Sequence, residues 1–245
     1  MNIALLLAAG KGTRLDSQTP KQFHLVDNKP VFSYSLETFH KVEEIDAIYV
    51  VTSIEGVRII KNYVDEHRLS KVKDVILGGK TRQESVYLGL LAMRKEINDK
   101  DRILIHDAAR ALVSERVILD NIRACEKDVA AATIYKVMDT MSVSLDDEYY
   151  HELVDRTHLY HGQTPQTFTY ELIRHAHEEA LEDHFEGTDD VGLVLRLHEK
   201  VKLVPGERKN FKITTMEDLK LFESIVLGEK EKKKVFDSKK RNGFD

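Results

Sequence analysis

Short hydrophobic runs recur along the 245-residue chain, and each has about the length of one β-strand. They are rich in isoleucine, valine and leucine and occupy residues 2–7, 47–52, 72–77, 102–106 and 131–135. Because both faces of these runs are apolar, they predict a buried, mostly parallel sheet. Between the runs, hydrophobic residues return at helical spacing in residues 31–40, 54–66, 83–97, 114–127 and 170–181. This alternation predicts an α/β protein with a Rossmann-like sheet and helices on both of its faces.

Several residues with strong local preferences mark the ends of these elements. Ser114 is suited to cap the start of a helix, and Pro30 suits a first helical turn. Gly10 and Gly78 follow predicted strands, where the chain needs a tight turn.

Residues 136–162 break the alternation. Residues 141–145 and 149–154 alternate between apolar and polar side chains around an acidic turn at Asp146 and Asp147, which predicts a projecting β-hairpin arm. The edges of an exposed hairpin need a cover, and a second subunit is the common one. We therefore expect a homodimer formed through this arm.

The rest of the chain predicts one domain, residues 1–227, followed by a tail. Residues 228–245 are strongly charged and contain few apolar side chains. Such a composition is typical of a solvated helix end and a frayed terminus.

Composition excludes several classes of protein. With 42% hydrophobic and 32% charged residues the body is not intrinsically disordered. A formal net charge of -5 gives no general attraction to nucleic acid or to an anionic membrane, so we expect neither as a partner. The single cysteine, Cys125, excludes an intrachain disulfide and suggests a packing role in a reducing compartment. The first hydrophobic run is too short to span a bilayer, and we expect a cytoplasmic protein.

The first strand leads directly into a loop of small and basic residues, Ala8-Ala9-Gly10-Lys11-Gly12-Thr13-Arg14. Ligands of open α/β sheets bind at this edge, and small residues let backbone N–H groups approach a phosphate chain. The dinucleotide fingerprint fails because Leu15 occupies its third glycine position, and no Gly-Lys-Ser/Thr of a P-loop occurs. Pro20 then starts a rigid turn that places a second cation, Lys21, near the loop.

At this point the sequence resembles the nucleotidyltransferases that make CDP-alcohols, in particular the 2-C-methyl-D-erythritol 4-phosphate and ribitol-5-phosphate cytidylyltransferases. The resemblance rests on AAGKGTR followed by PKQF and covers about residues 3–226. Further matching motifs follow in order, namely GG and TRQESV in residues 78–86, HDAAR in 106–110, DT in 139–140, DR in 155–156, QTPQ in 163–166, GTDD in 187–190 and NFKITT in 210–215.

The resemblance implies a nucleotidyltransferase fold of the GT-A-like kind and transfer of a cytidylyl group from CTP to an alcohol phosphate. Such a reaction needs positioning and charge neutralisation more than a protein nucleophile. The residues that match the family's catalytic cations are Arg14, Lys21 and Lys212. The residues that match its CTP-binding positions are Ala8, Ala9, Gly10, Gly12, Gly79, Ser85 and Ala108. A plain helix N-cap is the alternative interpretation of Ser85.

A metal site is expected at Asp107, which follows a predicted strand and so lies at the ligand-binding edge. Its carboxylate suits Mg²⁺ shared with triphosphate oxygens. The neighbouring His106 is expected to have a structural role and no metal role. The resemblance also implies that the alcohol phosphate is bound by Arg110, Thr140, Arg156, Thr164 and Thr188, with Arg156 reaching the neighbouring subunit's site.

The acceptor alcohol is the open question. The sequence departs from the family pattern at Lys80, where an acidic residue is common, at Ala111, where proline is usual, and at Ser142, where the methylerythritol enzymes usually have lysine. The motifs favour methylerythritol phosphate, and thus non-mevalonate isoprenoid synthesis. The alternative is a ribitol-5-phosphate enzyme that makes CDP-ribitol for wall teichoic acid or capsule. A non-catalytic nucleotide-binding module is a third interpretation, which the retained catalytic cations oppose.

Overall fold

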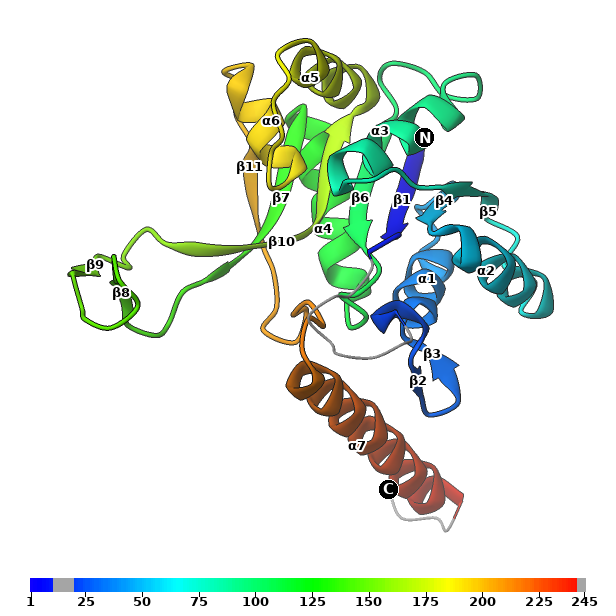
Figure 1. Ribbon diagram of the computed structural model, residues 1–245. Helices are drawn as coiled ribbons and strands as arrows, with labels where there is room; N and C mark the ends of the chain where they lie inside the picture. The colour runs from blue at the N-terminus through cyan, green and yellow to red at the C-terminus, as the bar shows by residue number, and fades with distance from the viewer. Residues whose placement is uncertain (11–19, 242–245) are drawn as a thin grey trace.

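The computed structural model describes residues 1–10 and 20–241, and its centre is a seven-stranded mixed sheet (Figure 1). The strand order is β11-β7-β10-β6-β1-β4-β5. All neighbours pair in parallel except β10, which is antiparallel to both β6 and β7. The strands are β1 (Asn2–Ala8), β4 (Ala47–Thr52), β5 (Val72–Leu77), β6 (Arg102–Asp107), β7 (Ala130–Lys136), β10 (Tyr160–Thr169) and β11 (Lys202–Pro205). The five predicted strands and the predicted α/β class are confirmed.

Helices cover both faces of this sheet. On one face, apolar side chains of α1 (Val31–Lys41), α2 (Ile54–Glu66) and α4 (Glu115–Lys127) pack with alternate residues of β1, including Ala4 and Leu6. On the other face, α3 (Arg82–Met93), α5 (Tyr170–Glu182) and α6 (Asp190–Arg196) pack against Ile3 and Leu5. The strand period of two thus divides each central strand between two cores.

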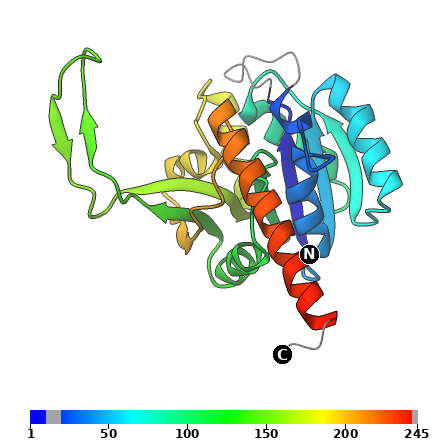
Figure 2. The ribbon, with the colours of Figure 1, turned by 90° about the horizontal axis from the view of Figure 1, so that it is seen from below.

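The arm is a long extension of β7 and β10 that ends in the short pair β8 (Met141–Val143) and β9 (Glu152–Val154). Figures 1 and 2 show it projecting from one side of the sheet. Both strands are shorter than predicted because the carboxylate of Asp146 organises the connecting loop. It accepts hydrogen bonds from the backbone N–H groups of Glu148 and Tyr149, each at 3.0 Å.

Two predicted boundaries differ from the structure. Helix α3 ends at Met93 rather than at residue 97, but Ile97 still packs on the core after the chain has left the helix. Because Ile97 is apolar and falls at helical spacing, the sequence pattern predicted a helix that is longer than α3. Pro30 is the N-cap residue of α1 and not part of its first turn. The predicted cap at Ser114 is confirmed, since its side chain accepts from the backbone N–H of Val117.

The longer elements that were not predicted are β10, α6, β11 and the first half of α7 (Met216–Arg241). Helix α7 crosses the predicted boundary at residue 227, so residues 228–241 continue a helix (Figure 2). Its first half is anchored by Leu219 and Phe222, which pack with Val26 and Val31. Short segments η2 (Lys21–Phe23), β2 (Leu25–Val26) and β3 (Lys29–Pro30) lie next to α1. Within the described residues no helix has the length and apolar content needed to cross a membrane.

Candidate active site

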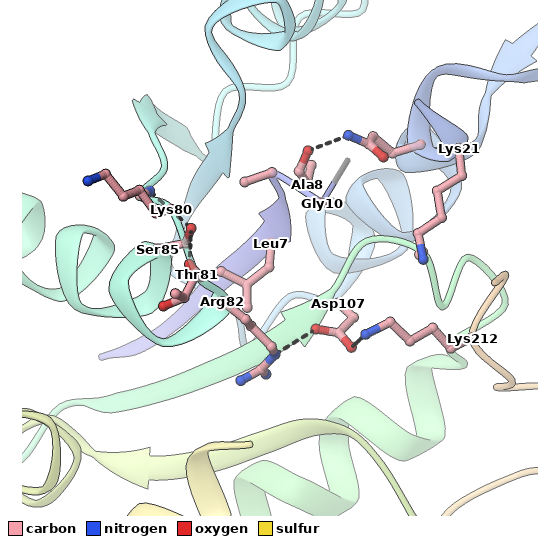
Figure 3. Close-up of a pocket in the computed structure, with 14 residues that line it drawn as sticks. Leu7, Ala8, Gly10, Lys21, Lys80, Thr81, Arg82, Ser85, Asp107 and Lys212 are labelled. Atoms are coloured by element: carbon pink, nitrogen blue, oxygen red, sulfur yellow. Dashed lines mark hydrogen bonds and ion pairs between the residues drawn. The ribbon is translucent and has the colours of Figure 1, made fainter. Parts of the chain in front are cut away.

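A pocket opens at the carboxyl edge of the sheet, between the ends of β1 and β6 and the start of α3 (Figure 3). This is the edge at which open α/β sheets bind ligands. Its small lining residues include Ala8, Ala9, Gly10 and Gly79, and its charged ones are Lys21, Lys80, Arg82, Asp107 and Lys212. Four cationic side chains thus line the pocket, and two of them, Arg82 and Lys212, pair with its one lining carboxylate, Asp107. Such a cationic pocket suits a polyphosphate ligand.

Gln22 holds the turn that carries Lys21 against the end of β1. Its Nε2 donates to the carbonyl oxygen of Ala8 at 2.8 Å, and Thr52 Oγ1 donates to the same oxygen at 3.2 Å. The Gln22 side chain is buried, so this hydrogen bond is shielded from water. The Lys21 side chain points into the pocket in Figure 3. Through this hydrogen bond, Gln22 keeps Lys21 near Ala8, Ala9 and Gly10 at the end of β1, as the sequence predicted.

Ser85 fixes the loop before α3. Its Oγ accepts from the backbone N–H of Gly79 at 3.1 Å and donates to the carbonyl of Thr81 at 2.8 Å. The N-cap of α3 is Thr81, whose hydroxyl accepts from the backbone N–H of Glu84, so the interpretation of Ser85 as a plain N-cap is wrong. A Cβ on Gly78 would lie 2.9 Å from Ser85 Oγ, and this close approach requires glycine.

Asp107 ends β6 and lies between two cations. Its Oδ1 is 3.2 Å from Arg82 Nε, and its Oδ2 is 2.7 Å from Lys212 Nζ. Burial alone would raise the pKa of Asp107, but the charges of Arg82 and Lys212 hold it far below its usual value. The carboxylate is therefore ionised and able to serve as a hard oxygen ligand.

His106 supports Asp107 from the interior of the sheet. Thr164 Oγ1 accepts from the backbone N–H of Asp107 at 3.1 Å and lies 2.9 Å from His106 Nδ1. His106 Nε2 lies 3.1 Å from the carbonyl oxygen of Arg110, which only accepts, so the ring carries its proton on Nε2. Burial lowers the pKa of His106 to about 4. A neutral, fully bonded ring supports the predicted structural role.

A second recess adjoins the first, and Lys212 lines both. The guanidinium of Arg110 is held at its wall because it donates to the carbonyls of Asn210 at 3.0 Å and Gly162 at 3.1 Å. The other polar or aromatic side chains of this recess are Tyr135, Asp139, His161, Gln163, Arg208 and Phe211. It is therefore a cation-rich neighbour of the first pocket.

Two hydrogen bonds bring the distant Lys212 to the end of β6. Asn210 Nδ2 donates to the carbonyl of Thr164 at 2.8 Å, and the backbone N–H of Ile213 donates to the carbonyl of Ala109 at 2.9 Å. They hold the loop on each side of Lys212. Asn210 is completely buried, so the loop's position is determined from within the core.

The structure brings together most of the predicted site residues. The predicted residues that line the first pocket are Ala8, Ala9, Gly10, Lys21, Gly79, Ser85, Asp107 and Lys212, and Arg110 lines the second. Ala108 is buried behind the wall, where its neighbour Ala109 is the lining residue. Thr164 is buried behind the first pocket, where its hydroxyl contacts His106 and the backbone N–H of Asp107. Gly12 and Arg14 lie outside the described residues.

Besides Ala108 and Thr164, three predicted residues line neither recess within one chain, namely Thr140, Arg156 and Thr188. All three are exposed. Thr140 and Arg156 belong to the arm, where Arg156 donates to the carbonyl of Met138. Thr188 lies in the loop before α6. Their contact with the alcohol phosphate stays a prediction.

Sequence analysis missed several residues of the site. Arg82 was not among the predicted site residues, yet it pairs directly with Asp107. Arg208 has a recognisable signal, because it is a cation four residues before Lys212 in the same turn. Tyr135 and His161 carry no such signal, since they enter the recess only through the pairing of β7 with β10.

This fold, with cations around one carboxylate at the sheet edge, defines a nucleotidyltransferase. The chain belongs to the 2-C-methyl-D-erythritol 4-phosphate cytidylyltransferase family, IspD, whose model matches residues 2–228. The enzyme makes 4-diphosphocytidyl-2-C-methyl-D-erythritol from CTP and 2-C-methyl-D-erythritol 4-phosphate, a step of non-mevalonate isoprenoid synthesis. The methylerythritol prediction is confirmed over the ribitol alternative.

Individual relatives agree with this assignment. A 2-C-methyl-D-erythritol 4-phosphate cytidylyltransferase from Clostridium novyi is 39% identical over 226 residues, which cover 92% of this chain and 96% of the relative. One from Caldanaerobacter subterraneus is 41% identical over 228 residues, with coverage of 92% and 99%. The crystal structure of 4-diphosphocytidyl-2C-methyl-D-erythritol synthase from Anaerococcus prevotii matches with a TM-score of 0.77 at 33% identity, covering 92% of this chain and 95% of that one.

Proposed function

We propose that the first recess binds CTP, that the second binds the alcohol phosphate, and that Lys212 serves both at the point of reaction. The single observation that carries this proposal is that Lys212 lines both recesses while it pairs with Asp107. An oxygen of the acceptor phosphate attacks the α-phosphorus of CTP and forms a new P–O bond. The bond from the α-phosphorus to the bridging oxygen breaks, and pyrophosphate leaves with the electron pair.

The cations stabilise the charge that develops during this displacement. Lys21 and Lys212 reach the recess from opposite ends of the sequence, and Arg14 joins them by its match to the family's loop. Such groups are most effective when they bind the transition state more tightly than the ground state. Ser85 and the backbone at Gly79 supply the polar groups for the pyrimidine edge, and Ala8, Ala9 and Gly10 leave room for the ring and phosphates.

Asp107 is the residue that would hold Mg²⁺. Within the described part of the chain no group of three or more His, Cys, Asp or Glu side chains could enclose a metal ion. One ionised carboxylate in a polyphosphate site nevertheless fits Mg²⁺, which often takes one or two protein carboxylates and completes its shell with phosphate oxygens and water. When bound, the ion supplies additional positive charge to the triphosphate. Lys212 and Arg82 keep the carboxylate ionised.

The arm supports a homodimer whose subunits complete each other's sites. It exposes an unusual number of large apolar side chains, namely Met138, Leu145, Tyr149, Tyr150 and Leu153, each at least 65% exposed. Exposed apolar surface of this kind marks an interaction site. Thr140 and Arg156 are on the same arm and outside their own chain's recesses, so a partner would bring them to the alcohol phosphate.

A cytoplasmic location also remains part of the proposal. Cys125 is buried, and burial raises the pKa of its thiol to about 12. A protonated, buried thiol of this kind packs as an apolar group and is poorly reactive, which suits a reducing compartment.

Mixing two inactive variants tests the shared site. Arg156→Ala removes the arm's contribution, and Lys212→Ala removes the cation between the recesses. If Arg156 acts in the partner's site, each hybrid dimer contains one intact site, and a mixture equilibrated in equal amounts regains about a quarter of wild-type turnover, because half of the dimers are hybrids. Absence of any recovery, with dimers shown by sedimentation, would contradict the exchange of arms.

A further inference from the structure

A buried histidine on α5 is bonded into the ion pairs of the active site. His177 and Asp190 are each only 1% exposed, and His177 Nε2 lies 3.1 Å from Asp190 Oδ1. The other carboxylate oxygen of Asp190 lies 2.7 Å from Arg82 Nη1. The same guanidinium reaches Asp107 through its Nε. An unbroken series of contacts therefore runs from His177 to the carboxylate at the bottom of the first recess.

The protonation states in this series follow from its chemistry. Burial alone would raise the pKa of Asp190, but the charge of Arg82 and the hydrogen bond of His177 lower it below its usual value. The ionised carboxylate only accepts, so the Nε2 of His177 carries a proton and donates it. The ring also lies nearly parallel to that of Tyr87, with 6.2 Å between ring centroids and 16° between ring planes. The hydrogen bond to Asp190 therefore sets the direction in which the imidazole donates.

Asp190 needs this donor because it is enclosed in the protein. A buried carboxylate oxygen without a partner is costly, and the group would rotate or move to find one. Asp190 begins α6, next to the cap residue Asp189, so its backbone is fixed and its side chain is the part that can move. Such a movement would break the hydrogen bond from Arg82 Nη1 to Asp190. The guanidinium could then rotate, and its Nε would no longer be held toward Asp107.

We infer that His177 is a positioning residue of the transfer reaction, which acts through Asp190 and Arg82 to hold Asp107 in place for the metal and the triphosphate. This inference rests on the proposed role of Asp107. It assigns His177 no contact with either substrate. It distinguishes His177 from the other histidine of α5, His175, which is exposed and whose Nδ1 lies 4.0 Å from Glu179 Oε1 on the same helix.

The test compares two substitutions of similar size. His177→Leu keeps the packing and removes the donor, whereas His177→Gln can place its amide N–H near the position of Nε2. His175→Leu is the matched control on the same helix. For each variant we would measure the thermal midpoint, kcat, both KM values and the Mg²⁺ concentration for half-maximal turnover. Binding of Mn²⁺ together with CTP, followed by electron paramagnetic resonance, gives a readout that is independent of turnover.

We expect His177→Leu to weaken Mn²⁺ binding and to raise the half-saturating Mg²⁺ concentration by about tenfold, a typical effect of losing an outer partner of a metal ligand. The KM for the alcohol phosphate should be unchanged, and His177→Gln should restore most of the loss. Wild-type metal binding in His177→Leu would overturn the inference. So would equal losses in both variants, including a failure of both to fold, because a donor would then not be what matters.

A parallel Asp107→Asn variant separates this inference from the proposal beneath it. If Asp107→Asn binds Mn²⁺ with CTP as tightly as the wild type does, the metal role of Asp107 itself is wrong. If Asp107→Asn loses that binding while His177→Leu keeps it, only the role of His177 is wrong.

Discussion

At the scale of single residues, the site is organised by the balance of charge around Asp107. Arg82 and Lys212 both pair with its carboxylate, and Arg82 pairs in addition with Asp190. Two carboxylates of the protein therefore fix the guanidinium of Arg82. Among the described residues, Asp107 is the one ion-pair partner of Lys212, which also lines both recesses, so we expect this lysine to exchange its carboxylate for a substrate oxygen.

Replacing this lysine should reduce turnover far more than binding. We expect Lys212→Ala to lower kcat by about 10²- to 10³-fold, the usual cost of removing a group that stabilises transition-state charge, with a smaller change in the KM for CTP. Lys209→Ala is the matched control, because Lys209 belongs to the same turn and, in the part of the chain that the structure describes, forms an ion pair only with Glu207 at 3.8 Å. Steady-state kinetics of both variants make the comparison. Equal turnover in the two variants would contradict the role of Lys212.

The buried His106 makes the stability of the protein depend on pH. Its pKa is about 4 in the folded state against 6.5 in an unfolded chain, so the unfolded chain binds the proton first as the pH falls. The free energy of unfolding should therefore decrease between pH 6.5 and pH 4, by up to about 3 kcal/mol from this group. Urea unfolding at pH 6.5 and 4.5 measures it. His106→Gln does not titrate and should show a smaller decrease, and an unchanged slope would refute this assignment.

At the scale of elements, β10 determines the site. It brings Thr164 to His106 and Asp107, it carries Gly162 and Gln163 into the second recess, and its outer end forms one side of the arm. Residues 163–166 were recognised only by resemblance, and they belong to this strand. A proline and polar side chains gave it no hydrophobic pattern. Its buried polar groups are satisfied by partners from distant segments, which no local pattern can indicate.

The elements that were predicted have their own hydrophobic patterns, whereas the missed ones depend on tertiary contacts. Strands β1, β4, β6 and β7 are apolar and almost wholly buried, so their runs are visible in the sequence. Strand β11 has one buried residue, Val204, and pairs at the edge of the sheet. The cations Lys21, Arg110 and Lys212 were found through the family's motifs, whereas Arg82 and Arg208 were missed. The contact of Arg82 with Asp190 was missed as well, because the two lie on different helices.

Helix α7 provides a prediction about its two halves. Phe222 is fully buried and packs edge to face on Tyr34 at 4.9 Å, so Phe222→Ala should lower the free energy of unfolding by about 3 to 5 kcal/mol. A chain that ends at Gly228 loses only the exposed pair of Lys230 with Asp27 among its described ion pairs. Its stability should fall by less than about 1 kcal/mol, and its kcat should be unchanged. Denaturant titrations compare the two, and a larger loss from the truncation would show that residues 228–241 are part of the domain.

At the scale of the whole molecule, the arm carries Thr140 and Arg156, which are predicted to bind the acceptor, away from both recesses of their own chain. Its exposed apolar side chains are the basis of the proposed dimer. We expect Leu153→Asp to convert the dimer to a monomer in sedimentation experiments, with turnover lost and CTP binding kept. Ile54→Asp, at a similarly exposed position on α2, is the control and should stay dimeric. A dimeric Leu153→Asp protein would contradict an interface through the arm.

The most direct test of the account is the release of pyrophosphate from CTP and Mg²⁺ by the wild-type enzyme, with 2-C-methyl-D-erythritol 4-phosphate, D-ribitol 5-phosphate or no acceptor. UTP and ATP replace CTP in parallel reactions. The account predicts rapid release with CTP and methylerythritol phosphate, and little with any other pair, because these are the two substrates of the family's reaction. Release with ribitol phosphate alone, or none with any acceptor, would contradict it.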